Sequence, residues 1–563
     1  MQLPGMVRSA RVVLLRSNHV IRASATSLST TSSCHNIIRS VVPEIVLPSG
    51  NLASYVLKDS HKWADKTAAE CTATGRAYTY AQMVDRVARW GGALTKLGLK
   101  KGDVLAIMML NCPEYPIVTL GAVSIGVSVS FINTIYTVEE IHRQLVNSEP
   151  KVVVSDTSLE DKVQAALLLY KKPTPVVING PSSISGAYDL RQILEDRTIA
   201  FADPVEVCGK DRAFMPYSSG TTGHPKGVVL SHDAVSSNIA MISHPHNFLH
   251  YETTGSHQDT FLGYLPFFHI YGSVLIMLMG LGKGIKIGTI PHFDPNTFVN
   301  LIGQHKVRII HTVPTVLNFL VHSPSATPKS MASVDICICG AAPVPPTTAV
   351  ALKEKVRKPL FFQEGFGMTE ILVTNITPVG QEKVGSCGPV VSNVQAKVVD
   401  LTTGDMLPAH QDGEICMKTP SMMTEYYKNP EATAQTIDDE GWLHTGDVGH
   451  YDEEGFFTIV DRTKDLIKVK ALQVSPSELE DLILQHPKVV EVSVVGVPDE
   501  RMGEVPRAYV VPSGSLKEAD VVEFLEERVA PHKKLAGGVV FLKEIPKNST
   551  GKPLKRELRN MAL

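Results

Sequence analysis

Short runs of aliphatic and β-branched residues alternate with longer amphipathic segments through most of this chain. The apolar runs have the length of buried strands, and the segments between them are long enough for helices. The predicted strands are 104–109, 151–155, 306–312 and 335–339, and examples of the predicted helices are 80–97 and 138–146. Strands joined through helices form βαβ units with parallel strands. The sequence therefore predicts an α/β fold with a mostly parallel sheet.

The pattern changes toward the C-terminus. From Gly413 onward, short strands indicate a β-rich module, and after Leu466 a compact pattern of helices and strands begins. The elements predicted there are a helix at 476–486, strands at 489–497 and 507–511, and a helix at 519–529. A chain of 563 residues has room for three or four folding units. We expect a large N-terminal domain over 44–461, made of βαβ subdomains and the β-rich module, and a small α+β domain over 466–563.

The charge balance argues against nucleic acid as a partner. The chain has 54 Lys and Arg against 57 Asp and Glu, which gives a formal net charge of −3. Such a chain offers no bulk positive field to a polyanion. We expect small-molecule partners instead.

The cysteines and histidines give no metal-binding pattern. Eight cysteines are dispersed, and the close pair Cys337 and Cys339 is too tightly spaced for a Cys-x-x-Cys knuckle. The chain has no His-Glu-x-x-His motif, and its 20 histidines show no ligand spacing. We interpret the cysteines as reduced thiols of the core.

Residues 1–43 differ in composition from the rest of the chain. They contain five arginines, a Ser- and Thr-rich stretch from Ser24 to Ser33, and no acidic residue before Glu44. This composition is typical of an organellar transit peptide, and the apolar run Val12 to Leu15 is too short for a membrane helix. We expect mitochondrial import. The alternative is an N-terminal tail without an address, and the C-terminal Met-Ala-Leu differs from the peroxisomal Ser-Lys-Leu signal.

The stretch 261–281 is apolar enough to suggest a membrane segment. It contains Pro266, His269 and three glycines, and its C-terminal half includes the run Ser-Val-Leu-Ile-Met-Leu-Met. A proline near a strand end followed by an apolar run favours a strand and a buried helix of a large α/β core. We expect no transmembrane segment.

A glycine- and hydroxyl-rich segment lies between two apolar runs at 217–228. It reads Tyr-Ser-Ser-Gly-Thr-Thr-Gly-His-Pro-Lys-Gly-Val, and a helix is predicted to start near Ser231. Glycines let the backbone curl, hydroxyls donate to phosphate oxygens, and Lys226 brings a positive charge to a polyphosphate. The segment does not fit the Walker A frame, so it predicts a phosphate-binding loop without implying the P-loop ATPase fold. The alternative, a solvated turn, explains the glycines but not the hydroxyl pairs together with the lysine.

With this loop as the first of seven ordered motifs, residues 45–560 resemble the adenylate-forming superfamily of acyl-CoA synthetases, adenylation domains and luciferases. The other six are Leu-Pro-Phe-Phe-His-Ile-Tyr-Gly at 265–272, Gly-Ala-Ala-Pro at 340–343, Gly-Phe-Gly-Met-Thr-Glu at 365–370, Gly-Trp-Leu-His-Thr-Gly-Asp at 441–447, Asp-Arg-Thr-Lys-Asp-Leu-Ile-Lys at 461–468, and Thr-Gly-Lys at 550–552. The chain is most similar to fatty acyl-CoA synthetases and 4-coumarate:CoA ligases.

The resemblance implies a reaction in two steps. A carboxylate attacks the α-phosphate of ATP and releases pyrophosphate, and the CoA thiol then attacks the acyl-adenylate. Positioning and charge neutralisation are the main tasks of such an enzyme, because two like-charged reactants must meet. The phosphate-binding residues implied are Ser218, Ser219, Gly220, Thr221, Thr222, Gly223 and Lys226. Glu370 and Thr222 would hold Mg²⁺, which takes oxygen ligands.

The resemblance also assigns the nucleoside. Asp447 would accept hydrogen bonds from both ribose hydroxyls, and Arg462 would assist it. Segments without bulky side chains permit close approach of the adenine to the backbone. The residues implied for this role are Gly340, Ala341, Ala342, Gly365, Phe366, Gly367 and Thr369, with Phe366 near the base.

For the acid, the resemblance implies that His269 lies beside the carboxylate and that Lys552 contacts the carboxylate and the bridging phosphate oxygen. A histidine in an apolar segment is by itself more often a core residue, and a lysine near the C-terminus is more often solvated. We expect Phe268, Ile270, Tyr271 and Val313 to line an apolar pocket, which suits an alkyl or aryl acid.

Two regions of the small domain would serve different half-reactions as that domain swings about a hinge at 462–465, with Lys464 at its centre. One region is the turn at Lys552. The other is the loop that contains Lys468, Lys470, Ala471 and Gln473 and that would face CoA. The family usually has glycine where this chain has Ala471, so a methyl group would stand close to the pantetheine path.

We expect an ATP- and CoA-dependent ligase for fatty acids of medium to long chain. The nearest alternative is an aryl-acid ligase similar to 4-coumarate:CoA ligase. A luciferase-like monooxygenase is disfavoured because nothing in the sequence indicates oxygen chemistry. A non-catalytic adenylate-binding protein is also disfavoured, because Lys226, Glu370, Asp447, Arg462 and Lys552 are all present.

Overall fold

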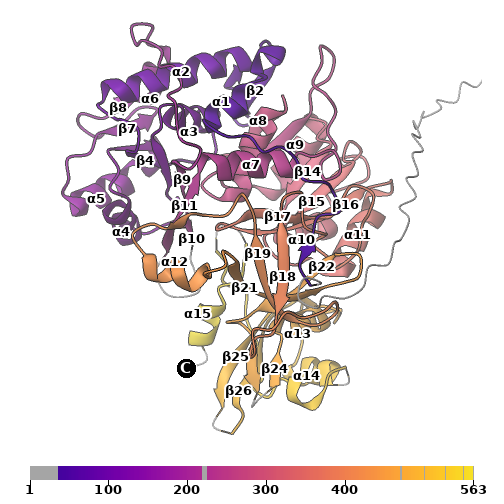
Figure 1. Cartoon of the computed structure of the whole chain (residues 1–563). Helices are drawn as coiled ribbons and strands as arrows, with labels where there is room; N and C mark the ends of the chain where they lie inside the picture. The colour runs from indigo at the N-terminus through magenta and orange to yellow at the C-terminus, as the bar shows by residue number, and fades with distance from the viewer. Residues whose placement is uncertain are drawn as a thin grey trace, which may run out of the picture. The chain divides into compact units, whose positions relative to one another are not determined.

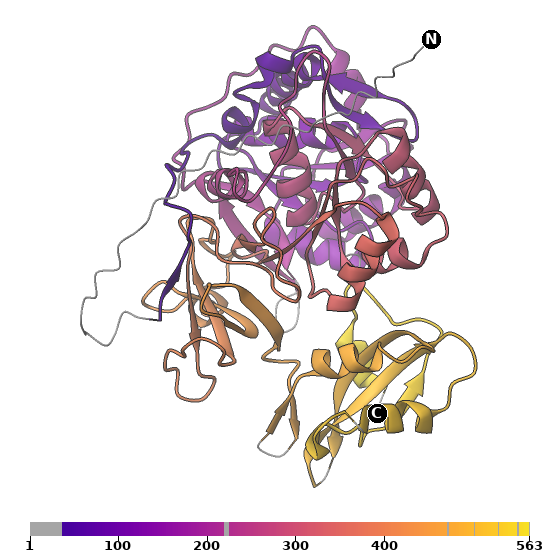
Figure 2. The same cartoon turned by 90° about the vertical axis from the view of Figure 1, so that its right-hand side faces the viewer.

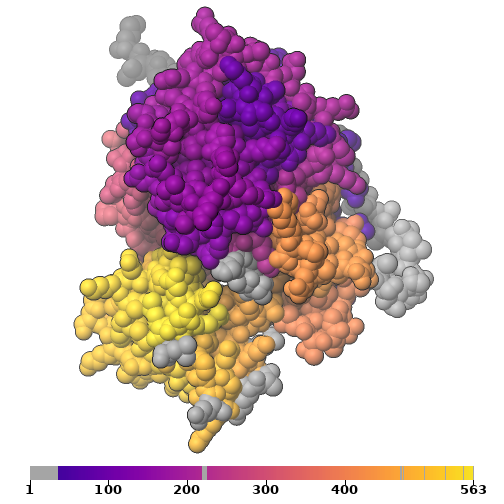
Figure 3. All heavy atoms as spheres, turned by 90° about the vertical axis from the view of Figure 1, so that its left-hand side faces the viewer, coloured from indigo at the N-terminus to yellow at the C-terminus, as the bar shows by residue number. Residues whose placement is uncertain are grey.

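The computed structural model describes residues 36–561, apart from short gaps at 219–224, 470–471, 500, 527 and 549–550. Within these ranges the chain forms five sheets. Consecutive stretches of sequence occupy contiguous regions of the surface, as the colour gradient in Figure 3 shows.

The largest sheet has nine strands in the order β10-β11-β9-β5-β4-β6-β7-β8, with β20 attached to β11. Its strands are β4 (Val104–Met108), β5 (Ser128–Phe131), β6 (Val152–Asp156), β7 (Val176–Asn179), β8 (Tyr188–Asp189), β9 (Arg212–Met215), β10 (Tyr217–Ser218), β11 (Lys226–Ser231) and β20 (Glu425–Tyr426). The strands from β9 to β8 pair in parallel, and β10, β11 and β20 add antiparallel strands at one edge. The predicted parallel α/β sheet is confirmed.

Helices cover both faces of this sheet, as Figure 1 shows around β4. They are α2 (Tyr80–Lys96), α3 (Glu114–Ser124), α4 (Val138–Ser148), α5 (Glu160–Tyr170), α6 (Leu190–Glu195) and α7 (His232–Ile242). Along β4, Leu105 and Ile107 belong to the apolar cluster that includes α2 and α3, whereas Ala106 and Met108 belong to the cluster that includes α4 and α5. A strand alternates its side chains between the two faces, so a continuous apolar run is buried on both.

Two four-stranded sheets follow. One has the order β12-β13-β2-β3 and the other β14-β15-β16-β17. Their strands are β2 (Thr67–Cys71), β3 (Ala77–Thr79), β12 (Thr260–Gly263), β13 (Lys286–Thr289), β14 (Ile309–Thr312), β15 (Ile336–Cys339), β16 (Phe361–Met368) and β17 (Leu372–Ile376). The accompanying helices are α1 (Leu52–Leu57), α9 (Pro295–Gln304), α10 (Pro314–His322) and α11 (Pro346–Val356).

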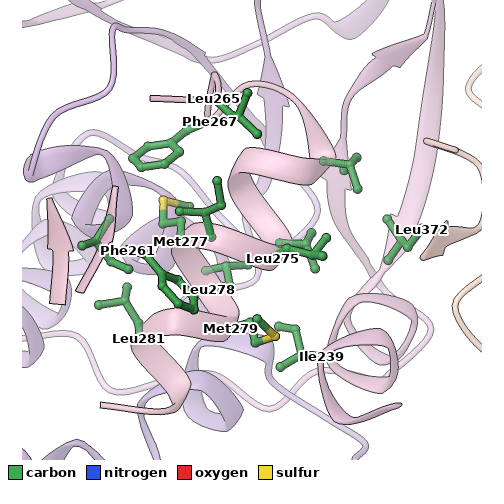
Figure 4. Packing of buried hydrophobic residues seen from close by; sticks show 14 of the residues in the cluster. Ile239, Phe261, Leu265, Phe267, Leu275, Met277, Leu278, Met279, Leu281 and Leu372 are labelled. Atoms are coloured by element: carbon green, nitrogen blue, oxygen red, sulfur yellow. The ribbon is translucent and has the colours of Figure 1, made fainter. Parts of the chain in front are cut away.

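The apolar stretch 261–281 forms β12 and a buried helix. The helix is a π-helix, η3 (Tyr271–Leu278), continued by α8 (Met279–Gly282). Figure 4 shows Leu275, Met277 and Leu278 among side chains from other elements, including Phe261 of β12. Among the described residues, no helix has the length and apolarity needed to cross a membrane.

The β-rich module is an antiparallel sheet of β1 (Ile38–Arg39), β18 (Gln395–Val399), β19 (Gly413–Lys418), β21 (Leu443–Tyr451) and β22 (Phe457–Arg462). The C-terminal sheet, gold in Figure 2, has the order β24-β23-β26-β25 with β27 beside β26. Its elements are β23 (Ile467–Val469), β24 (Leu472–Val474), α13 (Pro476–Ile483), β25 (Val489–Asp499), β26 (Gly503–Pro512), α14 (Glu518–Glu526), β27 (Val539–Phe541) and α15 (Lys555–Asn560). Helix α12 (Pro430–Thr436) precedes β21.

Element ends differ from the predictions for local reasons. The strand predicted at 306–312 begins only at Ile309, because Lys306 has φ 48° in the turn after α9. The strand predicted at 489–497 extends to Asp499, and the strand predicted at 507–511 already begins at Gly503. The reason is that β25 and β26 pair over almost their full length. Pairing between strands lengthens them beyond what the local apolar pattern indicates.

The N-terminal boundary also lies earlier than expected. Residues 36–43, expected to belong to the tail, are described, and Ile38 and Arg39 pair with Ala396 and Gln395 of β18. These residues therefore belong to the β-rich module. The rest of the predicted tail, residues 1–35, lies outside the described residues.

The cysteine prediction needs one correction. Of the described cysteines, Cys71, Cys112, Cys337, Cys339, Cys387 and Cys416 are free thiols in the interior, whereas Cys208 is a free thiol exposed to solvent. Cys208 lies in the irregular segment before β9, which offers no apolar layer to cover it.

Candidate active site

The two ends of the predicted phosphate loop are brought together by β10 and β11. Ser218 and Lys226 are paired across this antiparallel ladder. The loop residues Ser219, Gly220, Thr221, Thr222 and Gly223 lie outside the described residues. The ladder holds both ends of the loop at one edge of the large sheet.

Glu370 lies beside this edge and is buried. Its Oε1 accepts a hydrogen bond from the Ser218 hydroxyl at 2.7 Å and another from the Tyr426 hydroxyl at 2.9 Å. The Lys226 ammonium lies 5.0 Å from the centroid of the Tyr426 ring. The predicted phosphate lysine and the predicted metal ligand are thus joined through a tyrosine that no motif indicated.

The predicted ribose residues are neighbours on paired strands. Asp447 of β21 stands opposite Arg462 of β22, and the Arg462 Nε donates to Asp447 Oδ1 at 3.0 Å. Burial raises the pKa of Asp447, and the positive charges of Arg462 and Lys552 oppose that effect. An ion pair of this kind fixes the carboxylate in an acceptor geometry suited to two hydroxyls.

Lys552 lies in the same charged group. Burial lowers its pKa to about 8, with repulsion from Arg462 as the next cause. The turn that carries it is closed by Asn548, whose Oδ1 accepts from the Lys552 amide at 2.9 Å. The neighbouring Gly551 carbonyl accepts from the Thr315 hydroxyl of α10 at 3.2 Å. This hydrogen bond attaches the turn to the large domain.

His269 is half-buried at the start of the π-helix. Burial, together with the nearby positive charge of Lys552, lowers its pKa to about 4. A neutral imidazole next to an ammonium can contact a carboxylate without adding a second positive charge. The structure therefore brings together His269 and Lys552, which the sequence separates by most of the C-terminal half.

Of the two segments predicted to lie against the adenine, one follows β15 directly and the other lies within β16. Gly340 follows β15, and a Cβ there would lie 3.5 Å from the Tyr271 ring. Ala341 has φ 76°, a left-handed conformation that costs a non-glycine residue about 1 kcal/mol or more. Gly367 lies in β16, where a Cβ would collide with the Leu372 carbonyl. Thr369, Gly365, Phe366 and Ala342 are half-buried around these positions.

The residues predicted to line the acid pocket all lie within the described part of the chain. Phe268, Ile270 and Val313 are buried, and Tyr271 is half-buried with its hydroxyl donating to the Ile338 carbonyl at 3.1 Å. These residues come from the segment after β12 and from the junction of β14 with α10. That they line one pocket stays a prediction.

The predicted CoA loop is described only in part. Lys464 and Lys468 are exposed, and Lys468 pairs with Gln473 across β23 and β24. Lys470, Ala471 and the side chain of Gln473 lie outside the described residues. The roles of this loop stay predictions.

Sequence spacing missed one cluster. Glu414 and Cys416 of β19 and His444 of β21 place their ligand atoms within 4.8 Å of one another. Hydrogen bonds to Cys416 and Glu414 raise the pKa of His444 to about 10. Glu414 also accepts from the Gly446 amide at 3.1 Å, beside Asp447. Through the Gly446 amide this cluster is connected to the turn before Asp447.

Comparison with known proteins agrees with this geometry. Residues 57–427 match the profile of the AMP-binding enzymes, and residues 478–552 match that of the AMP-binding enzyme C-terminal domain. The chain belongs to the AMP-binding enzyme family. It is 34% identical over 539 residues to the probable 4-coumarate–CoA ligase 1 of Dictyostelium discoideum, covering 92% of this chain and 96% of that relative. It is 37% identical over 543 residues to the 4-coumarate–CoA ligase-like 9 of Oryza sativa subsp. japonica. That match covers 93% of this chain and 95% of that relative.

Solved structures show the same fold. ATP-bound MatB from Rhodopseudomonas palustris superposes with a TM-score of 0.82 at 30% identity, covering 91% of this chain and 98% of that one. The anthranilate CoA ligase AuaEII with anthranoyl-AMP gives a TM-score of 0.83 at 24% identity, covering 92% of this chain and 98% of that one. At this identity the similarity shows the fold alone. This family member is an ATP-dependent acid:CoA ligase that works through an acyl-adenylate. Its partners are ATP, CoA and a small carboxylic acid.

Proposed function

We propose that the acid is an aryl acid. The observation that carries this proposal is the Tyr271 ring, one edge atom of which would lie 3.5 Å from a Cβ on Gly340. A second ring, His311, meets Tyr271 edge to face at a centroid distance of 5.9 Å. Aromatic walls that pack edge to face and face to face suit a planar substrate. The 4-coumarate–CoA ligase names of the relatives agree with this choice.

Each charged group has a role in the first step. Lys552 and Lys226 would neutralise the carboxylate and the phosphates as they meet, and Asp447 would hold the ribose. Neutral His269 would orient the carboxylate by a hydrogen bond. The hydroxyls around the Glu370 carboxylate form an oxygen-only donor set, which is the set that Mg²⁺ takes. When bound there, Mg²⁺ would withdraw negative charge from the phosphates.

A fatty acid is the second candidate, and one observation favours it. Phe268 and Ile270, which flank His269, are both no more than 9% exposed and offer purely apolar surface. An alkyl chain is stabilised by burial against such residues and does not need an aromatic ring to stack on.

A panel of acids separates these candidates. Pyrophosphate release is measured with aryl acids and with straight-chain acids of roughly two to sixteen carbons, a range that a ligand pocket of ordinary size admits. Each acid is assayed both with and without CoA. The proposal expects the highest kcat/KM for an aryl acid and acyl-CoA formation when CoA is present. A higher kcat/KM for alkyl acids would favour the second candidate. Absence of release with every acid would indicate a non-catalytic adenylate-binding protein.

A further inference from the structure

Asn111 is a buried residue that follows β4 at the carboxyl end of the large sheet. Its side-chain Nδ2 donates to the carbonyls of Gly263 at 3.0 Å and Leu265 at 2.8 Å, and its Oδ1 accepts from the Phe267 amide at 2.9 Å. Leu265 and Phe267 belong to the buried apolar cluster of Figure 4. An asparagine amide has two N–H donors and one carbonyl acceptor. Both the amino and the carbonyl group of this side chain therefore bind the backbone of one segment, 263–267.

That segment leads directly into His269. The His269 amide donates to the Pro266 carbonyl at 3.1 Å, which closes a turn just before the π-helix. A Cβ on Gly272, in the first turn of that helix, would lie 2.2 Å from the Pro266 carbonyl oxygen. The turn and the start of the helix are thus packed backbone against backbone, with no room between them. Because of this packing, a shift of 263–267 is passed on to His269.

Asn111 is itself fixed from the side of the large sheet. Asp156, the buried last residue of β6, accepts from the Leu110 amide at 2.6 Å and from the Asn179 side chain of β7 at 3.1 Å. Strands β4, β6 and β7 are parallel neighbours, so their carboxyl ends meet at one edge. Gly263 ends β12, which belongs to another sheet. Asn111 therefore connects the firmly held edge of the large sheet to the segment that carries His269.

We infer that Asn111 is a positioning residue for the first half-reaction, because it holds the backbone that places His269 beside the carboxylate of the acid. The inference rests on the role of His269 in the proposed function. Leucine has nearly the volume of asparagine but can neither donate nor accept a hydrogen bond, so Asn111→Leu would deprive three backbone groups of this partner. The segment would then move, and a displacement of about 1 Å can slow a reaction roughly a hundredfold.

A double-mutant cycle tests whether Asn111 acts through His269. The proteins are the wild type, Asn111→Leu, His269→Ala and the variant that combines both changes. Asn111→Ser is a milder second variant, because it leaves room for a water molecule, and it replaces Asn111→Leu in the cycle if that variant does not fold. The control is Asn51→Leu, since the Asn51 side chain also donates to backbone carbonyls, those of Ser124 and Val205, away from the predicted site residues. Pyrophosphate release is measured at varied acid and at varied ATP, and thermal unfolding is recorded for every protein.

We expect Asn111→Leu to lower kcat/KM for the acid by roughly tenfold or more and to change KM for ATP by less than about twofold. Asn51→Leu should also unfold at a lower temperature, but its kcat/KM for the acid should stay within about twofold of the wild type. In the His269→Ala background, Asn111→Leu should cost no more than about threefold, because the group that Asn111 positions is gone. Asn111→Ser should show the same pattern with smaller losses.

A loss that is as large in the His269→Ala background as in the wild type would make Asn111 a purely structural residue. That result would overturn the inference and leave the role of His269 intact. Equal losses of kcat/KM in Asn51→Leu, or wild-type activity of both Asn111 variants, would overturn it as well. Wild-type kcat/KM in His269→Ala would instead reject the role of His269 in the proposed function, together with the inference that rests on it.

Discussion

At the scale of single residues, the site works through charges that perturb one another. Lys552, Arg462 and Asp447 share one partly buried region, so each carries an interaction energy that it would lack in water. His269 is kept neutral and Lys552 is brought close to losing its proton. This charge coupling and the backbone conformation of the site can each be tested with single substitutions.

The first concerns Lys552. The first half-reaction needs the protonated ammonium, and a lowered pKa means that the proton is lost as the pH rises through about 8. We expect kcat/KM for pyrophosphate release to fall on the alkaline side with a midpoint near that value, because kcat/KM reports the free enzyme. Lys552→Arg should move this fall to higher pH, because a guanidinium stays charged. An alkaline limb that is identical in Lys552→Arg would assign the titration to another group.

The second concerns Ala341, which adopts φ 76°. Glycine adopts this conformation without a clash, so we expect Ala341→Gly to raise the free energy of unfolding by about 0.5 to 1 kcal/mol. The matched control is Ala342→Gly next to it, which should lower that energy by about the same amount, because glycine gains unfolded-state entropy. Denaturant titration measures both. A lower free energy of unfolding in both variants would show that the backbone of Ala341 is not strained.

At the scale of elements, the short strand β20 matters more than its length suggests. It pairs with β11 immediately after the phosphate loop and so delivers Tyr426 to both Glu370 and Lys226. A strand of two residues is enough, because its pairing with β11 fixes the direction of the Tyr426 side chain.

We expect Tyr426→Phe to lower kcat/KM for ATP by roughly tenfold, since a hydrogen bond to a charged group contributes about 1.5 to 3 kcal/mol. Tyr427→Phe is the control at the next position. Its ring stacks under Arg212 at 4.7 Å, and a phenyl ring retains that interaction. Initial rates at varied ATP measure the effect, and equal losses in both variants would point to damage of β20 in general.

At the scale of the whole molecule, the C-terminal turn and the N-terminal segment both attach to the large domain through few groups. The turn does so through Gly551, which has a φ of 82° and where a Cβ would lie only 2.7 Å from Thr315 Oγ1, so a side chain at this position would be strained. The N-terminal segment does so through the β1 pairing and through the Asn393 side chain, which bonds the amide and the carbonyl of Ile45.

We expect Lys552→Ala to reduce adenylate formation by more than about a hundredfold, because it removes the charge that meets the bridging oxygen. Thioester formation from supplied acyl-adenylate should be spared. Gly551→Ala should show the same selectivity, since a Cβ would push the turn away from Thr315. Rapid mixing that follows each half-reaction separately measures this. Equal losses in both steps would contradict the assignment of the turn to the first.

For the N-terminus, we propose mitochondrial import of the tail and predict two deletion boundaries. Removal of residues 1–35 should leave the thermal stability unchanged, whereas removal of residues 1–43 should lower it, because the second deletion takes β1 away from β18. Thermal unfolding compares the two proteins. A reporter fused to residues 1–35 should enter mitochondria, and a uniformly cytosolic reporter would contradict the import proposal.

The sequence by itself determined the parallel α/β fold, the β-rich module, the small C-terminal domain and the family. Apolar periodicity and the order of motifs can be seen directly in the sequence, without knowledge of contacts between distant residues. Through the family resemblance it also predicted that Glu370, Asp447, Arg462 and Lys552 belong to one site, and the structure brings Asp447, Arg462 and Lys552 together. Only the tertiary structure showed what holds them.

Three residues illustrate the physical reason. Tyr426 reaches Glu370 across 56 positions and Thr315 reaches Gly551 across 236, and nothing in the spacing of residues so far apart encodes a contact. His311 looked like part of an ordinary apolar strand, because a sequence pattern registers burial but not whether a buried nitrogen has found a partner. Strand order and side-chain packing decide those contacts, and they exist only once the chain has folded.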